Sequence, residues 1–422
     1  MKQLIYLSGC LFLCLLLGSC QSDNKETEQS QYSTDVLFPR GKDCTNPAGY
    51  NYLISMENAQ EKTLEDLLDS NYAISITPLQ IDDPKHLLGE ISKLWDYGDS
   101  LIYIADLQIA NKIYAFNRDG KLKFVIDDTG QGPGQYKKMW DVQYNVHRKI
   151  LQVWDLPQHK MLSFSLNGDF LEEKKINKEI VSFYPVTEDW YIYHLDGRDY
   201  MGQKKPLLLY SDISGEKVMK KGAWEYGMVD AFPSRIQFSL YDGSVYFSSA
   251  MMDTIYWIGP VNGQICPDYV IDFGKKKLPE EIKKQEDLMR IGQMIQQAGS
   301  SFSIGNLLVG RTFLHFEWLS NEKDREDKFF HFVDRHEYLS YKVREKNFSL
   351  FGIGIERLSF SKLHDFIGYS YLHKINKTLL KQAIASDKVH AKTKAELAKL
   401  LKFEEQEMPF LIQFRLKHTQ NY

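Results

Sequence analysis

The chain has 422 residues and a formal net charge of −4, from 52 basic and 56 acidic side chains. These charges are interspersed, which excludes the kind of basic stripe that binds nucleic acid. Aromatic residues make up 13% of the chain, with 25 tyrosines and 24 phenylalanines, and this composition favours β-sheet. The length exceeds one average domain but suits a single large all-β unit.

The N-terminus has the pattern of a bacterial lipoprotein signal peptide. Lys2 precedes an apolar stretch, Leu4 to Leu17, that is too short to cross a bilayer as a helix. Two small residues and then Cys20 follow it at once. We expect removal of residues 1–19 and acylation of Cys20, with palmitate among the acyl chains, so that the lipid anchors the protein to a membrane. An ordinary secretory signal, with the cysteine present by chance, is the alternative.

Gln21 rather than Asp follows the cysteine, and by Gram-negative sorting rules this favours an outer-membrane lipoprotein, either periplasmic or surface-exposed. Residues 20–70 are expected to form a flexible tether. Residues 21–35 contain almost nothing to bury, and the following stretch mixes Pro, Gly and Asn with a few aromatics. A short helix is predicted near Leu64 to Leu68.

Five cysteines occur in the chain, and two of them leave with the signal peptide. Beyond the acylated Cys20, Cys44 and Cys266 remain. They could form a disulfide in an oxidising compartment, or they could be two unpaired thiols. We favour unpaired thiols, because two cysteines alone have no spacing signature.

From about residue 72 the sequence repeats a unit of short strands and tight turns. Strand-forming segments such as Leu101–Asp106 and Lys112–Phe116 are followed by an Asp-Gly turn, and a similar order returns three times. Four strands in ~48 residues is the spacing of a propeller blade, although a pair of packed sheets without a true period is an alternative. The turn glycines are Gly120, Gly168, Gly215 and Gly263, at separations of 48, 47 and 48 residues.

Counting these units predicts an all-β, six-bladed β-propeller over residues 71–418. Helical inserts are expected at about 275–298 and 376–405, where the strand pattern stops. The last blade lacks one strand, so we expect residues 72–79 to pair with 410–416 and to close the ring. The expected blades are 88–127, 136–176, 180–221, 231–273, 302–345 and a sixth that begins near Leu350.

Several segments match a known family of propellers. Leu88–Ile91, Ile104–Asp106, Asp119–Lys121 and the glycine-rich Gly130–Tyr136 together resemble the six-bladed β-propeller lipoprotein family, which is related in fold to the NHL-repeat propellers. Glu is more usual in that family where this chain has Gln135. The resemblance covers about residues 72–417 and implies the fold and a cell-envelope location. It implies no particular reaction, because related propellers include binding platforms as well as lyases and hydrolases.

Candidate ligand-binding residues gather on one expected rim of the ring. Gly130–Tyr136 joins the first two blades, and it either presents Gln131 and backbone amides to a ligand or is a structural corner. Arg198 could hold a carboxylate or sugar hydroxyls, or it could form a surface pair with Asp199. Arg235 begins an inner strand and is expected near the centre of the ring. The candidates are Gln131, Tyr136, Asp155, His159, His194, Arg198, Asp199 and Arg235.

The sequence predicts neither a cofactor nor a metal site, because its 11 histidines are scattered and it has no phosphate loop, nucleophile elbow, HExxH or CxxC motif. Our leading hypothesis is a lipid-anchored, non-catalytic binding or scaffolding module for a glycan, a peptide or a partner protein. The second is a lyase or hydrolase acting on polysaccharide or peptide, whose acid and base would come from Asp155, His159, His194 and Asp199. The third is a structural assembly component that docks through its helical inserts.

Overall fold

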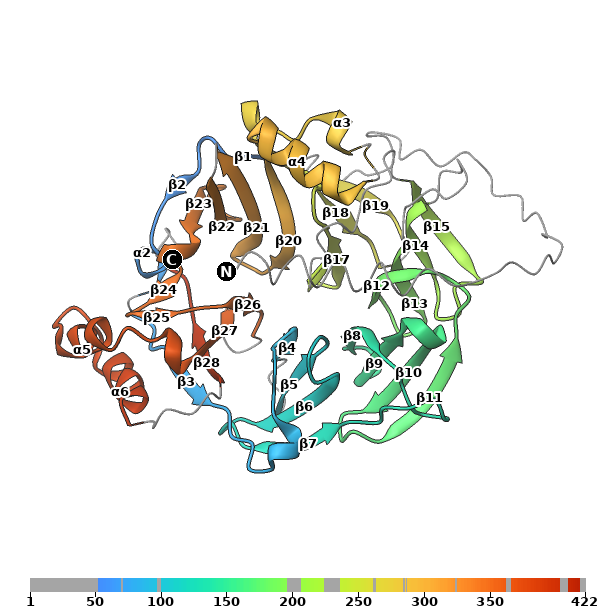
Figure 1. Ribbon diagram of the computed structural model, residues 1–422, viewed down its shortest axis with the longest axis horizontal. Helices are drawn as coiled ribbons and strands as arrows, with labels where there is room; N and C mark the ends of the chain where they lie inside the picture. The colour runs from blue at the N-terminus through green and yellow to red at the C-terminus, as the bar shows by residue number, and fades with distance from the viewer. Residues whose placement is uncertain are drawn as a thin grey trace. The chain divides into compact units, whose positions relative to one another are not determined.

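The computed structural model describes residues 52–69, 71–96, 100–195, 206–223, 236–260, 263–283, 285, 287–322, 325–361, 366–402 and 409–417. All of them belong to one compact unit, residues 37–422. Six small sheets are arranged as a six-bladed β-propeller, as the sequence predicted (Figure 1).

The first three blades are four-stranded antiparallel sheets that follow one another along the chain. Blade one contains β4 (Lys93–Trp95), β5 (Leu101–Asp106), β6 (Lys112–Asn117) and β7 (Leu122–Ile126). Blade two contains β8 (Met139–Asn145), β9 (Ile150–Asp155), β10 (Lys160–Ser165) and β11 (Phe170–Lys175). Blade three contains β12 (Ile180–Pro185), β13 (Trp190–Leu195), β14 (Pro206–Asp212) and β15 (Val218–Ala223).

The other three blades each borrow a strand from the N-terminal part of the chain. Blade four contains β16 (Phe238–Tyr241), β17 (Ser244–Phe247), β18 (Thr254–Ile258), β19 (Ile265–Asp272) and the added β1 (Tyr52–Ser55). Blade five contains β20 (Ser301–Val309), β21 (Phe313–Glu322), β22 (Arg325–Asp334), β23 (Ser340–Arg344) and the added β2 (Gln60–Glu61). Blade six contains β26 (Arg357–Ser359), β27 (Phe366–Tyr371), β28 (Pro409–Phe414) and β3 (Ser75–Pro78).

The turn glycines that revealed the repeat occupy a conformation that other residues avoid. Gly120 has φ 86° and Gly263 has φ 60°, and both follow the third strand of their blades. A Cβ at Gly120 would lie 1.9 Å from the carbonyl oxygen of Pro78. Gly120 is therefore required both by the tight turn and by the close approach of the neighbouring blade's outer strand.

The hydrophobic core lies between the blades rather than within one sheet. One buried apolar cluster fills each junction between neighbouring blades, because a single four-stranded sheet cannot cover its own faces. Between blades one and two, for example, Tyr103 packs with Val153 and Phe164. This radial burial holds the innermost strands in fixed positions around the propeller axis.

The ring is closed by strands from both ends of the domain, as the sequence predicted. β28 pairs antiparallel with β3, in a register that places Ile412 opposite Ile76. β3 is thus the outer strand of blade six, while the chain next enters blade one. Breaking this pairing would open the ring at one junction.

Residues 52–69, here called the strap, are folded onto the outside of the ring, so the expectation of a flexible tether up to residue 70 is wrong for them. β1 adds in parallel to β19 of blade four, and β2 adds in parallel to β23 of blade five. The helix α2 (Leu64–Leu67) follows, with a capping box at Thr63 and buried leucines. The strands are short and lie on outer edges, so they lack the long alternating pattern by which strands are recognised.

The two predicted helical inserts are present in the described ranges. α3 (Glu280–Lys283) and α4 (Leu288–Ala298) lie between blades four and five, and α5 (Lys377–Ala385) and α6 (Ala391–Leu400) interrupt blade six. None of the helices in these ranges is long and apolar enough to cross a membrane. The remaining elements are the hairpin β24 (Ser349–Leu350) and β25 (Ile353–Gly354) and the 3₁₀ turns Pro84–His86, Leu156–Gln158, Gly274–Lys276, Glu345–Asn347 and Leu372–Lys374.

Candidate functional site

Polar side chains gather on or next to the innermost strands of otherwise apolar blades. Each innermost strand ends the strand order of its sheet and lies nearest the centre of the ring (Figure 1). The side chains come from five blades and are at most 9% exposed. We call them the inner cluster: Lys93, Asp141, Gln143, Ser182, His194, Gln237 and Asn306. Of these, His194 lies on β13, the second strand of blade three, and Gln237 directly precedes β16.

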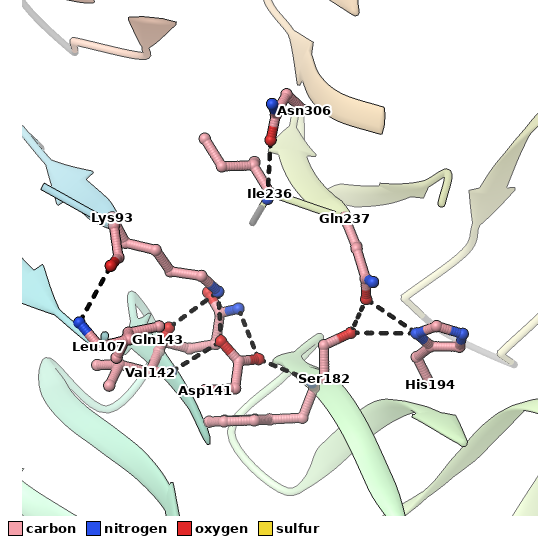
Figure 2. A network of polar contacts seen from close by, with 12 residues as sticks. Lys93, Leu107, Asp141, Val142, Gln143, Ser182, His194, Ile236, Gln237 and Asn306 are labelled. Carbon is pink, nitrogen blue, oxygen red and sulfur yellow. Dashed lines mark hydrogen bonds and ion pairs between the residues drawn. The ribbon is translucent and has the colours of Figure 1, made fainter. Parts of the chain in front are cut away.

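A buried ion pair joins the first three blades within the inner cluster. Lys93 of β4 donates from Nζ to Oδ1 of Asp141 on β8 and to the carbonyl oxygen of Val142, at 3.2 Å for the latter. Asp141 Oδ2 accepts the backbone N–H of Phe183 in blade three at 3.0 Å and the side-chain amide of Gln143 at 3.3 Å (Figure 2). A buried carboxylate needs this many donors, because burial removes its hydration.

A second group links blades three and four around the predicted candidate His194. Its ring is fully buried, lies 5.1 Å from the ring of Phe247, and Nδ1 is 2.9 Å from Oε1 of Gln237 (Figure 2). Ser182 Oγ also donates to Oε1 of Gln237, and the Gln237 amide donates to Ser249 Oγ at 3.3 Å. The side chains of two blades are thus locked together by one amide.

Ser182 and His194 resemble a nucleophile and its base, but their geometry opposes that role. Ser182 Oγ is 3.5 Å from Nδ1 of His194, whereas the carbonyl oxygen of Gln237 is closer to the same nitrogen. An amide oxygen can only accept, so Nδ1 carries a proton and cannot take one from the serine. This pair therefore supports the structure rather than acyl transfer.

The remaining inner contacts cross the junctions of blades four to five and six to one. Asn306 Oδ1 accepts the N–H of Ile236 at 3.4 Å (Figure 2). In blade six, Arg357 of β26 donates to the carbonyl oxygen of Ser92 at 3.2 Å, and Ser359 of β26 donates to that of Leu94 at 2.7 Å; both acceptors belong to blade one. A small cavity of about 10 Å³ is lined there by residues that include Ser92, Lys93, Ile236, Arg357, Ser359 and Tyr369. This is below the usual size of a site for a drug-sized ligand.

Blade five buries a carboxylate and two imidazoles. Burial favours the neutral form of Glu317, but the positive charges of Lys328, whose Nζ is 2.8 Å away, and of Arg357 lower its pKa. Burial lowers the pKa of His315 to about 4 and that of His331 to about 3. Both imidazoles are therefore neutral near pH 7 and are unsuited to exchanging protons there.

The predicted rim loop Gly130–Tyr136 is held by its tyrosine. Tyr136 is fully buried, and its hydroxyl donates toward the carbonyl oxygens of Asn111 and Ile126, 3.0 and 3.1 Å away. Burial, followed by the negative charge of Asp127, raises the pKa of Tyr136. We therefore interpret Tyr136 as a structural residue, whereas Gln131 is exposed and stays a candidate for ligand contact.

Asp155 also serves the backbone. It is fully buried at the end of β9, where its carboxylate accepts the N–H of Lys137 at 2.6 Å and that of Gln158 at 3.3 Å. Asp106 does the same at the end of β5, where it accepts the N–H groups of Gly89 and Glu90 at 2.9 and 2.8 Å. An aspartate at the end of the second strand thus binds the backbone just before the innermost strand in both blade one and blade two, which indicates a structural role.

The structure does not gather the residues proposed for proton transfer. Asp155 and the exposed His159, which ends the short turn at φ 49°, belong to the rim of blade two. His194 belongs to the junction of blades three and four. The candidates Cys20, Arg198, Asp199 and Arg235 lie outside the described residues.

Sequence reasoning missed most of the inner cluster. Lys93 and Asp141 are charged residues inside segments that are otherwise apolar, and this was the available signal. Trp140 was also missed: it is 37% exposed at the start of the innermost strand β8, beside Asp141. Within the described ranges, no group of three or more His, Cys, Asp or Glu side chains is placed to hold a metal ion.

Cys266 corrects one expectation. It is 6% exposed on β19 and is disulfide-bonded, so the interpretation of two unpaired thiols is wrong for this residue. The other four cysteines lie outside the described residues.

Two solved structures share the architecture. A presumed exported protein of Bacteroides fragilis has 16% identity and a TM-score of 0.67, and the match covers 87% of this chain and all of that one. A member of the DUF4221 family from Bacteroides vulgatus has 9% identity and a TM-score of 0.54, with 82% and 98% covered. At these identities the likeness shows the fold alone.

No curated protein is detectably similar to this chain in sequence. One family model matches residues 52–415, which begin at the strap and end just after the closing strand. These bounds contain every blade described above. The chain therefore belongs to the family described as a domain of unknown function, DUF4934.

Proposed function

We propose that this protein is a lipid-anchored propeller of the cell envelope that binds a glycan, a peptide or a partner protein without transforming it. One observation carries the proposal: amide, hydroxyl and charged side chains gather towards the centre of the ring (Figure 2), and Trp140, which precedes Asp141 on the innermost strand β8, is 37% exposed. Amides and hydroxyls hydrogen-bond polar ligands, and an indole ring supplies a flat apolar surface on which a sugar ring or side chain can stack.

The condition of the polar groups favours binding over catalysis. Lys93 and Asp141 neutralise each other, and His194 is committed to Gln237. His315 and His331, the two buried imidazoles of blade five, have pKa values far below neutrality. An enzyme of acid–base type needs a group whose pKa lies near the working pH and that reaches the substrate, and the buried His315 and His331 meet neither requirement.

The envelope location rests on the N-terminal sequence. Lipid at Cys20 would tie the propeller to the outer membrane, as in the NHL-related lipoprotein propellers that the sequence resembles. The presumed export of the Bacteroides fragilis protein of similar fold is consistent with this location. Mass spectrometry of the N-terminal peptide, with and without Cys20→Ser, tests the acylation directly.

The binding proposal is tested with purified protein on arrays of glycans and of peptides. Trp140→Ala should weaken any specific binding by about tenfold, because a stacking residue at the centre of a site carries much of its energy. Phe170→Ala is the matched control, since Phe170 is 41% exposed on the outermost strand of the same blade. It should change binding by less than about twofold.

Equal losses in both variants, or no loss in Trp140→Ala, would contradict a site at the centre of the ring. Arg198→Ala examines the predicted rim site in the same assay. If the bound glycan or peptide is shortened during incubation, the alternative of an envelope lyase or hydrolase gains its first support.

A further inference from the structure

The strap is anchored at its first residue by stacked aromatic rings. Tyr52 of β1 packs against Tyr269 of blade four, with ring centroids 5.1 Å apart, and against Tyr338 of blade five at 4.7 Å. The hydroxyls of Tyr52 and Tyr338 are 3.0 Å apart. The strap is therefore fixed to two blades at the point where the described chain begins.

The register of β1 places its first residue close to the disulfide-bonded Cys266. Tyr52 lies opposite Tyr269 in a parallel pair of strands, and Cys266 precedes Tyr269 by three residues on β19. Cys44 precedes Tyr52 by eight residues, and eight residues can span up to about 29 Å, so Cys44 can reach Cys266.

We propose that Cys266 is joined to Cys44, and that this disulfide is a covalent clasp for the start of the strap. Cys266 needs a second cysteine, and the chain has four others. Two of them lie in the leader stretch that precedes the predicted cleavage point, and Cys20 would carry its lipid as a thioether. Cys44 is the cysteine that remains, and it lies within reach.

The bond forms by exchange with an oxidising disulfide, such as that of an envelope dithiol oxidase. One thiolate of the chain attacks the oxidant's disulfide and forms a mixed disulfide, and the second thiolate then displaces the oxidant's remaining sulfur. Two cysteine thiols are oxidised to one disulfide, and the oxidant leaves as two thiols. An oxidising compartment, which the exported state supplies, is thus required.

The clasp would change where a force on the proposed lipid anchor acts on the propeller, an inference that rests on the proposed function. A pull from the membrane would reach the chain through residues 21–43 and would pass at Cys44 directly into β19, which lies between β1 and β18 in the five-stranded sheet of blade four. Without the bond, the same pull would act on the first backbone hydrogen bonds of β1 and peel the strap from the ring. The clasp therefore separates the ring's closure from the movement of the anchor.

The clasp is tested by non-reducing peptide mapping of the full chain, exported by a host with an oxidising envelope. Trypsin should release residues 43–62 and 236–275 as one joined peptide that reduction separates. The joined peptide should be absent in Cys44→Ser. The amides of β1 should then exchange with deuterium roughly tenfold faster, whereas Thr45→Ala should leave them unchanged.

Three outcomes would overturn the proposal: Cys266 alkylated as a free thiol before reduction, Cys266 joined to a cysteine other than Cys44, or a covalent dimer on a non-reducing gel. Cys20→Ser keeps the test separate from the proposed anchoring. That variant should lose membrane attachment and retain the joined peptide, so the two ideas fail independently.

Discussion

The two buried histidines of blade five should make the propeller sensitive to mild acid. His315 and His331 lie on neighbouring strands, β21 and β22, and are 1% and 0% exposed. Neither ring nitrogen of His331 has a hydrogen-bond partner among the described residues. Burial lowers the pKa of His315 to about 4 and that of His331 to about 3. Both must therefore be neutral in the folded protein, although they protonate freely once it unfolds.

The sign and size follow from the difference between the folded and unfolded states. An unfolded histidine titrates near 6.5, so the stabilisation from each neutral ring is complete above that pH and is lost as the pH falls toward 4 or 3. Between pH 7.5 and 5.0 each histidine should cost about 2 kcal/mol of unfolding free energy. Asp268 acts the other way: burial raises its pKa to about 6, so its protonation in the folded state returns about 1.4 kcal/mol. The net loss for these three groups is about 2.6 kcal/mol.

The assay is urea denaturation at pH 7.5 and pH 5.0 for the wild type and for His331→Phe. Phenylalanine suits the site because His331 stacks on Phe316 within an apolar junction, with ring centroids 4.8 Å apart. The variant should lose about 2 kcal/mol less on acidification than the wild type, and all other titrating groups cancel in this comparison. His373→Phe is the control, since that ring is exposed. An identical pH dependence in the wild type and His331→Phe would refute the reasoning.

Two further changes test how the ring is held together. Lys93→Met leaves Asp141 buried without its cation and should lower the unfolding free energy by about 3–5 kcal/mol. The control is Lys121→Met, at an exposed side chain, which should change the unfolding free energy by less than about 1 kcal/mol. A loss of the same size in both variants would count against a stabilising role of the buried pair. Removing residues 409–422, or separately deleting 72–79, takes away one strand of the closing pair β28–β3. Neither variant should give a folded monomer by circular dichroism and gel filtration. A compact truncated monomer would contradict this account of the ring closure.

The sequence predicted those parts of the fold that depend on local pattern. Alternating strands and turn glycines such as Gly120 repeat in blades one to four, because each of these blades needs a tight turn after its third strand. The closing pair was also predictable, since one unmatched strand remained at each end of the repeat. The helical inserts were visible where the strand period stopped.

The strap was not predictable from the same signals. Tyr52 pairs with Tyr269, which is 217 residues away in the sequence, and no local pattern specifies a parallel partner at that distance. The few apolar residues of 52–69 are spread among polar ones, which is also the composition of a tether. The distinction depends on a long-range surface that exists only after blades four and five have formed.

The residues of the candidate site were only partly predicted, for a different reason. Tyr136 and Asp155 are residue types that often contact ligands, but here they fix a loop and the entry to an inner strand. The pairing of Lys93 with Asp141 was not predicted, because the two residues are 48 positions apart in the sequence and lie in different blades. Residue type and spacing cannot distinguish a buried donor that organises the backbone from one that is offered to a ligand.

The borrowed strand β3 imposes an order on folding. Ser75 pairs with Gln413, which is 338 residues later, so synthesis at 5–20 residues per second separates the two by about 20–70 s. During that time blade six has no outer strand, and Ser75–Pro78 waits as an unpaired segment that could join another chain. Pro78 has no N–H to donate, which weakens such wrong pairings while still allowing the single native one. A proline that is tolerated at the edge of the finished ring therefore protects the chain before the ring exists.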